Sequence, residues 1–399
     1  MKHLNNSLLR AAGFLAAFAT TLSASVSIGS KDNIQIGGFF SQGWIKSSGN
    51  NYPVEALDGT GDFREMAINI NTTVGSHLRL GAQGFAQSIG NYGNDKVLLD
   101  WAVVDYNFRP EFGLRAGRVK FPKGLYGEAL DLDMVRPFVF LPMGIYNPVT
   151  RDFNASFNGA MVYGSIGAGR AGTFDYKVFF GDIPMNSDQG VADFFTTTGI
   201  YAAPGVQELG MDYTTGAQVF WNTPLSGLRI GVSYSYLSKV FGNGKFAYFP
   251  AADIKVVGDK YSYKTVSVEY IRNNWTFAAE WESVGDTFNV TSLGPVQKEV
   301  SGSEVWYVSA AYRLNSRFEL GTYFSRIENA NAAANTPSAQ RKLDDIAISA
   351  RFDLNENVLF KVEYHEIDGR MGLFNTPRTP NPIKKDSSSF FAAKTTFSF

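Results

Sequence analysis

Few side chains in this 399-residue chain are arranged for catalysis. The chain has no cysteine, which excludes a thiol nucleophile, a thiolate metal site and a disulfide framework. A Ser–His hydrolase would need a serine beside His77 or His365, and no Gly-x-Ser-x-Gly motif accompanies either. Glu280 and Glu282 share one face of an alternating segment and could do acid–base work, but wall charges exposed to water are the simpler interpretation. We expect no catalytic centre, metal or cofactor.

Charged side chains do gather in one stretch, which is interrupted by prolines at 122, 137, 142 and 148. Proline restricts the backbone, so the stretch from 121 to 155 is expected to be a stiff loop. Its charges are the cations Arg118, Lys120, Lys123, Arg136 and Arg151 and the anions Glu128, Asp131, Asp133 and Asp152. They could act on passing ions, or neutralise one another and fix the shape of the loop. The alternation from 114 to 120 is ambiguous, so Arg115 could face inward in place of Arg118.

The amino terminus is typical of an export signal. Lys2, His3 and Arg10 precede an apolar run from 11 to 19, and small residues follow. The run is too short for a membrane-spanning helix, which needs roughly 20 residues. We predict a cleaved signal peptide over 1–25 and a mature chain over 26–399, with the cut after Ala24 or Ser25. With Lys+Arg 36 against Asp+Glu 37, nothing indicates nucleic-acid binding.

From Ile34 onward, segments of about ten residues alternate between apolar and polar side chains, which is the length that a tilted strand needs to cross a bilayer. In residues 275–282, Trp275, Phe277 and Trp281 share one face. Glu280 and the other polar residues share the opposite face. One face therefore suits lipid and the other suits water.

Short turns near 75, 224, 273, 315 and 355 alternate with long connections near 47–61, 121–155, 183–211, 239–259, 286–301, 328–341 and 368–387. A soluble β-sandwich also alternates, but this sidedness is typical of a membrane barrel. The pattern predicts an all-β fold: a transmembrane antiparallel β-barrel of about sixteen strands. An even count places both chain ends on the short-turn side, so the last strand, which ends at Phe399, can pair with the strand that begins near Ile34.

The segment GRVKFPKGLYGEALDLDMVRPFVFLPMGIYNPVTRDFNASFNGAMVYG, from 117 to 164, and the terminal Phe399 resemble the Gram-negative outer-membrane porin superfamily of sixteen-stranded trimeric barrels, which includes relatives of the phosphate-selective porins. The resemblance implies that the loop at 121–155 folds into the lumen as a constriction. Its charges then become the candidate ion filter, because charged rings at a narrow point set selectivity. The arginine ladder and lysine cluster of the phosphate-selective relatives are not found by spacing, so phosphate specificity is not predicted.

The resemblance also implies partners and location: a homotrimer in outer-membrane lipid, inserted by the barrel-assembly machinery through the strand ending in Phe399. The expected function is passive diffusion of small hydrophilic solutes and ions through a water-filled channel. Five cations against four anions in the loop stretch indicate a mild anion preference. Two other hypotheses stay open, which are a barrel hydrolase using His77 or His365 and a non-conducting barrel for adhesion or interaction.

Overall fold

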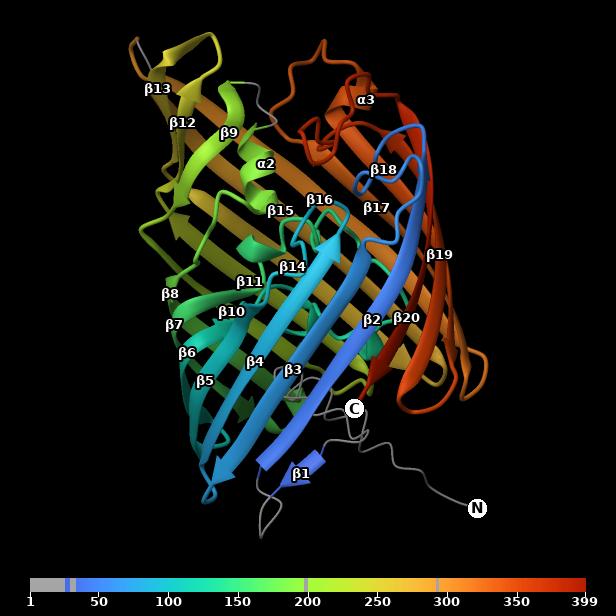
Figure 1. Ribbon diagram of the computed structural model, residues 1–399. Helices are drawn as coiled ribbons and strands as arrows, with labels where there is room; N and C mark the ends of the chain where they lie inside the picture. The colour runs from blue at the N-terminus through green and yellow to red at the C-terminus, as the bar shows by residue number, and fades with distance from the viewer. Residues whose placement is uncertain (1–25, 29–33, 197–199, 292–293) are drawn as a thin grey trace.

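Sixteen antiparallel strands follow one another around a closed ring (Figure 1). The structure, a computed structural model, describes residues 26–28, 34–196, 200–291 and 294–399. The export signal expected over 1–25 therefore lies outside the described residues. The ring consists of β2 (Ile34–Ser48), β3 (Phe63–Val74), β4 (Leu78–Ile89), β5 (Leu98–Arg109), β6 (Phe112–Lys120), β7 (Ser156–Gly167), β8 (Thr173–Asp182), β10 (Tyr213–Asn222), β11 (Leu228–Ser238), β14 (Tyr261–Arg272), β15 (Trp275–Thr291), β16 (Gln297–Arg313), β17 (Phe318–Asn329), β18 (Lys342–Asp353), β19 (Val358–Gly369) and β20 (Ser387–Ser398). The predicted barrel and its strand number are confirmed.

The ring closes between the first and last of these strands. Phe397 of β20 pairs with Phe40 of β2. One residue beyond β20, the backbone amides of Phe399 and Gly38 each donate to the other's carbonyl oxygen at 3.0 Å. Because every strand of the ring has two neighbours, no long edge is left unpaired. The predicted position of Phe399, beside the strand that begins at Ile34, is confirmed.

The described part of the chain also contains strands that the sequence did not predict. β1 (Val26–Ile28) pairs with β2. β9 (Tyr201–Gly210), β12 (Val240–Phe246) and β13 (Phe249–Gly258) form a sheet that extends the wall upward from β10, β11 and β14, and β13 pairs with the end of β15 (Figure 1). The long connections predicted at 183–211 and 239–259 therefore contain strands, and the one predicted at 286–301 is largely occupied by the ends of β15 and β16. The buried Ala252, Ile254 and Val256 alternate with exposed residues, which is the pattern of a strand.

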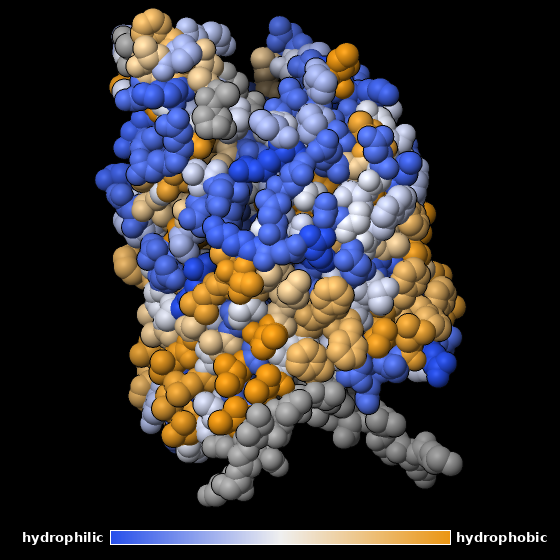
Figure 2. Space-filling view, viewed as in Figure 1, coloured by the Kyte–Doolittle hydropathy of each residue, from blue (hydrophilic) through white to orange (hydrophobic). Residues whose placement is uncertain are grey.

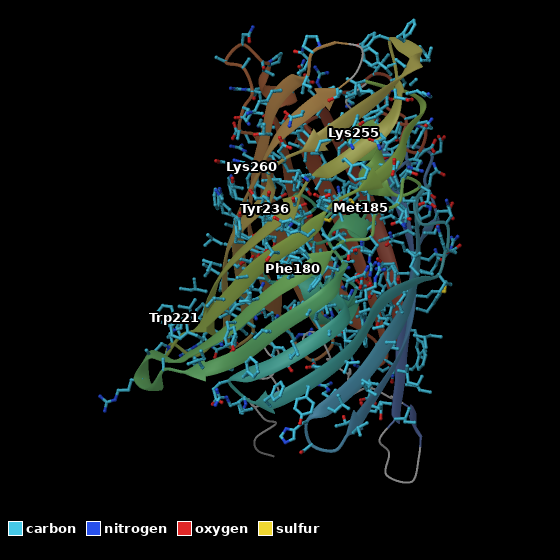
Figure 3. All side chains as sticks on the ribbon, turned by 90° about the vertical axis from the view of Figure 1, so that its left-hand side faces the viewer. Phe180, Met185, Trp221, Tyr236, Lys255 and Lys260 are labelled. Carbon is cyan, nitrogen blue, oxygen red and sulfur yellow. The ribbon has the colours of Figure 1, made fainter. Side chains whose placement is uncertain are left out.

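The outer wall is apolar and the inner wall is polar, as the alternation predicted. Trp275, Phe277 and Trp281 are exposed on the outside, while Glu280 and Glu282 on the same strand are buried inside. Hydrophobic side chains gather over the lower half of the face in Figure 2, and hydrophilic ones cover the upper half. From the side, Trp221 lies lowest of the labelled residues, Phe180 lies near the middle of the wall, and Lys260 and Lys255 lie higher (Figure 3). An outward apolar band below a charged region is the surface of a membrane barrel.

Helical structure is sparse. Within the described residues, the helices are α2 (Gly190–Thr196) and α3 (Ser338–Arg341), with 3₁₀ turns η1 (Gly127–Ala129), η2 (Asp133–Val135), η3 (Arg151–Phe153) and η4 (Gly169–Ala171). None of the helices in the described ranges is long and apolar enough to cross a bilayer. Three of these 3₁₀ turns, η1, η2 and η3, lie in one connection, between β6 and β7.

That connection spans 121–155, as predicted, and it lies inside the barrel (Figure 1). Its apolar segment packs on the wall: the ring of Phe140 stacks on Phe63 with centroids 5.1 Å apart, and Phe138 meets Tyr323 edge-on at 5.2 Å. Val139 and Phe140 are buried with residues of β2, β3 and β18–β20. Phe138, Val139 and Phe140 therefore fix the loop to the wall.

Candidate functional site

The constriction loop, residues 121–155, is held by charged groups that β19 points inward. The carboxylate of Glu363 accepts hydrogen bonds from the backbone amides of Val139 and Phe140, at 2.8 and 2.9 Å. Lys361 Nζ donates to the carbonyl oxygens of Asp133 and Phe138, at 2.7 and 2.9 Å. These bonds satisfy loop backbone groups that have no ladder partner, so the charges act here as anchors.

A first group of predicted filter charges closes the base of the loop. Arg151 donates to Asp131 at 2.7 Å and to Asp100 at 2.6 Å, and Lys120 contacts both carboxylates. Burial alone would raise the pKa of Asp131, but Arg151 and Lys120 outweigh it and hold that pKa well below its usual range. The guanidinium of Arg151 also lies 3.8 Å from the ring centroid of Phe85. This cluster ties the loop to β4 and β5.

A second group centres on Asp133, which lies on the η2 turn. Its carboxylate pairs with Arg136 at 2.9 Å and with Lys394 of β20 at 2.8 Å, and it accepts from Thr396 at 2.7 Å. Burial opposes ionisation of Asp133, yet Lys361, Lys394 and Arg136 keep its pKa well below the usual value. Lys394 further contacts Glu65. The side chains of Lys361 and Lys394 are 0% and 1% exposed, so the loop covers this part of the wall.

A third group faces the outer half of the barrel. Lys123 pairs with Glu282 at 2.9 Å, donates to the Ile145 carbonyl at 3.1 Å and lies 4.2 Å from the ring centroid of Tyr263. Close by, Glu280 accepts from Tyr146 at 2.6 Å and from the amide of Leu125 at 2.8 Å. The two glutamates considered for acid–base work thus hold the loop to β15.

The remaining predicted cation, Arg118, is not with these groups. Arg115 is buried on the lumen side, where it pairs with Asp105 at 2.9 Å. Residue 118 is three positions further along β6 and points to the other face, where Nε donates to the Asp100 carbonyl and to Ser156. The alternative placement, with Arg115 turned inward, is the one that the structure adopts. Glu128 on η1 contacts Lys177 of β8 and lies 3.8 Å from Arg115.

One carboxylate oxygen of Asp152, Oδ2, is buried without a hydrogen-bond partner in the described structure. Burial raises the pKa of Asp152 to about 7, against weaker lowering by backbone amides, including that of Val191 on α2. The helix packs closely here, since a Cβ added to Gly190 would lie 1.8 Å from the Val149 carbonyl. Asp152 therefore lies at the contact between the constriction loop and α2.

Below the loop, ion pairs that the sequence analysis missed line the lumen and keep contact with water. In each pair the cation is the more exposed partner: Lys177 is 24% exposed against 8% for Glu128, and Arg229 is 20% against 11% for Glu269. Arg313, at 35%, is also more exposed than its two acidic partners. The sequence indicates these cations, because Lys177, Arg229 and Arg313 each lie at an inward position of an alternating strand.

Cavities lie on both sides of the constriction loop. The outer one is about 260 Å³ and is bordered by the loop, α2 and the upper ends of β14–β18. The inner one is about 480 Å³ and reaches from Met134 of the loop to the turns that follow β16 and β18. The loop thus separates an outer from an inner space.

The histidines considered for catalysis have other roles. The two nitrogens of His365 contact Asp345 and Glu363, each at 2.8 Å, and its ring stacks on Phe390. His77 contacts the carbonyl oxygen of Asn107 at 2.7 Å and stacks on Tyr106. Within the described ranges, no serine hydroxyl is bonded to either ring, and no cluster of three His, Asp or Glu side chains could hold a metal ion.

Solved structures share this fold over nearly the whole chain. The anion-selective porin from Comamonas acidovorans matches with a TM-score of 0.55 at 12% identity, over 92% of this chain and 99% of that chain. The outer membrane channel DcaP of Acinetobacter baumannii matches with a TM-score of 0.53 at 13% identity, over 94% and 100%. OmpT of Vibrio cholerae, an outer membrane protein solved in a trimer form, matches with a TM-score of 0.50 at 13% identity, over 92% and 99%. No protein-family model and no curated protein matches the chain.

Proposed function

We propose that this protein is an outer-membrane porin through which small hydrophilic solutes and ions diffuse passively, without catalysis. The observation that carries the proposal is a closed barrel with an apolar outside and a charged inside, crossed by a loop that separates two cavities. The solved structures of similar fold include a porin and an outer membrane channel.

The same proposal covers assembly. The chain is exported with a signal over 1–25, is inserted into the outer membrane by the barrel-assembly machinery through β20 and Phe399, and functions as a homotrimer. The trimer form of OmpT, which has a similar fold, supports the last point. The predicted filter role of the loop charges is also retained, with Arg115 in place of Arg118.

Mild anion selectivity is part of the proposal, and it rests on the inner half of the lumen. The cations Lys177, Arg229 and Arg313 are more exposed than their acidic partners, so a passing ion meets positive charge first. The loop charges contribute less, because most are closed into ion pairs away from water.

Reversal potentials in a salt gradient test the selectivity. The triple variant Lys177→Gln, Arg229→Gln, Arg313→Gln should shift the reversal potential toward cation preference, whereas Lys255→Gln, which removes an exposed cation from β13, should not. If the triple variant and Lys255→Gln shift the reversal potential equally, the selective charges are not Lys177, Arg229 and Arg313. Cation selectivity of the wild type would contradict the proposal.

One observation favours a second function, a non-conducting barrel used for interaction. Several inward wall charges opposite the loop are at most 1% exposed, including Glu280, Lys361 and Lys394. Swelling of proteoliposomes in an isotonic sugar separates the two functions. A porin admits arabinose and the vesicles swell; vesicles that stay unchanged at full protein incorporation would support the non-conducting barrel.

A further inference from the structure

The outer cavity, about 260 Å³, lies on the path between the outer loops and the constriction. Most of the side chains that line it are apolar, although a porin lumen is expected to be polar. They include Phe153 of the loop, Phe195 of α2, Val284 and Phe288 of β15, Ile327 of β17 and Phe374 of the connection after β19. An apolar, partly enclosed space with a few polar groups is the usual form of a small-molecule site.

The charges at this cavity cancel. Lys123 and Glu282, which both line it, form an ion pair at 2.9 Å. The ammonium group is further occupied by the Ile145 carbonyl and the face of Tyr263. A neutral pair with its donors already used offers no net attraction to an ion. The cavity therefore favours an uncharged occupant.

Two asparagines line the same space, the partly buried Asn147 and the exposed Asn329, and each has an NH₂ group that can donate. The Oδ1 of Asn147 accepts from the amide of Val149, and the Oδ1 of Asn329 accepts from the amide of Asn331, both at 2.9 Å. Since a backbone amide can only donate, these bonds identify the oxygen of each side chain and leave its NH₂ group on the other side. Neither NH₂ group donates to any residue that the structure describes. Both residues line the cavity.

We propose that the outer cavity binds a neutral small molecule with an aromatic or alicyclic body and a hydrogen-bond-accepting oxygen. The apolar lining receives the ring, and the NH₂ groups of Asn147 and Asn329 donate to the oxygen. A closed apolar cavity of roughly 150 Å³ holds benzene, so a space of about 260 Å³ accommodates one ring with a carbonyl substituent. Binding in the cavity does not depend on the proposed channel function. Only the further step, that the bound molecule is the solute that crosses the membrane, rests on it.

Isothermal titration of the folded full-length protein in detergent with benzamide tests the site, and D-glucose serves as the polar comparison. Benzamide should bind saturably, once per chain, and glucose should give no saturable heat. Asn329→Asp keeps the acceptor for Asn331 but loses the donor, so it should weaken benzamide binding about three- to tenfold. Val284→Thr, which makes the lining polar at nearly constant volume, should weaken it as well.

A matched control is Asn315→Asp. Asn315 caps the amides of Arg317 and Phe318 in the same way, at 2.9 and 3.0 Å, but at the opposite rim. It should bind benzamide like the wild type. The inference is overturned if benzamide gives no saturable heat, if glucose binds as tightly, or if Asn329→Asp and Asn315→Asp behave alike. Vesicle swelling on the same preparation keeps the two proposals apart: swelling without binding removes only the cavity assignment, and binding without swelling removes only the channel.

Discussion

At the scale of single residues, the charges of the constriction loop serve its position before they serve ions. Glu363 binds two loop amides that are 224 and 223 positions away in the sequence. Asp131 and Asp133 are each surrounded by cations. From the sequence, these charges could either filter ions or fix the shape of the loop. The structure supports a role in fixing the loop for most of them. Such pairings could not be predicted, because no spacing in the chain relates a loop residue to the wall residue that it will meet.

Removal of the Glu363 anchor should loosen the constriction. Glu363→Ala loses two charge-assisted hydrogen bonds, each worth about 1.5–3 kcal/mol, and leaves two buried amides and the Nε2 of His365 without a partner. We expect a higher single-channel conductance with more frequent current fluctuations. Glu366→Ala is the matched control, because Glu366 is exposed on the outer face of the same strand. Unchanged conductance in Glu363→Ala would show that the loop does not depend on this contact.

Asp152 should make the contact between the loop and α2 depend on pH. Its pKa is raised to about 7 in the folded protein from 3.8, so the folded state holds the proton more tightly. The stability of the contact is therefore fully present below pH 3.8 and is lost as the pH rises through about 7. Hydrogen exchange of residues 145–155 and 190–196, corrected for the intrinsic rate, should be faster at pH 8 than at pH 5. Asp152→Asn should abolish the difference, and a difference that persists would assign it to another group.

At the scale of elements, strand alternation predicted most of the wall correctly. Trp275 and Glu280 lie on the predicted sides, and Phe360 and Lys361 follow the same alternation. The sheet of β9, β12 and β13 was not predicted, because its strands lie within segments that the alternation of short and long connections assigned to loops. The side of Arg115 was undecided for a physical reason, since the end of β6 bears charges on both faces and no apolar face identifies the lipid side.

The pairing of Phe399 with Gly38 predicts how the barrel closes. Deletion of Phe399 removes two backbone hydrogen bonds and exposes the edge of β2, so we expect a lower yield of folded barrel on heat-modifiable gel electrophoresis. Phe399→Ala keeps the backbone pairing that closes the barrel and removes only the aromatic side chain. It therefore distinguishes the role of the pairing from recognition of the side chain during assembly. Equal yields for the deletion and the wild type would contradict a closing role for this residue.

At the scale of the whole molecule, the barrel provides the passage and the loop determines its character. Apolar residues face outward along the lower wall, an aromatic-rich cavity lies above the loop, and partly exposed cations lie below it. A solute entering from the outer side therefore meets an apolar binding space first and positive charge second. This order is a property of the assembled barrel, since the residues concerned come from strands spread over the whole sequence.

Single-channel recording in planar bilayers shows whether the lumen conducts and whether the loop narrows it. The purified protein should give defined current steps, with three equal sublevels if it is a trimer. Glu363→Ala should give larger steps under the same conditions. Bilayers that contain folded protein but show no steps, in the wild type and in Glu363→Ala alike, would contradict the account.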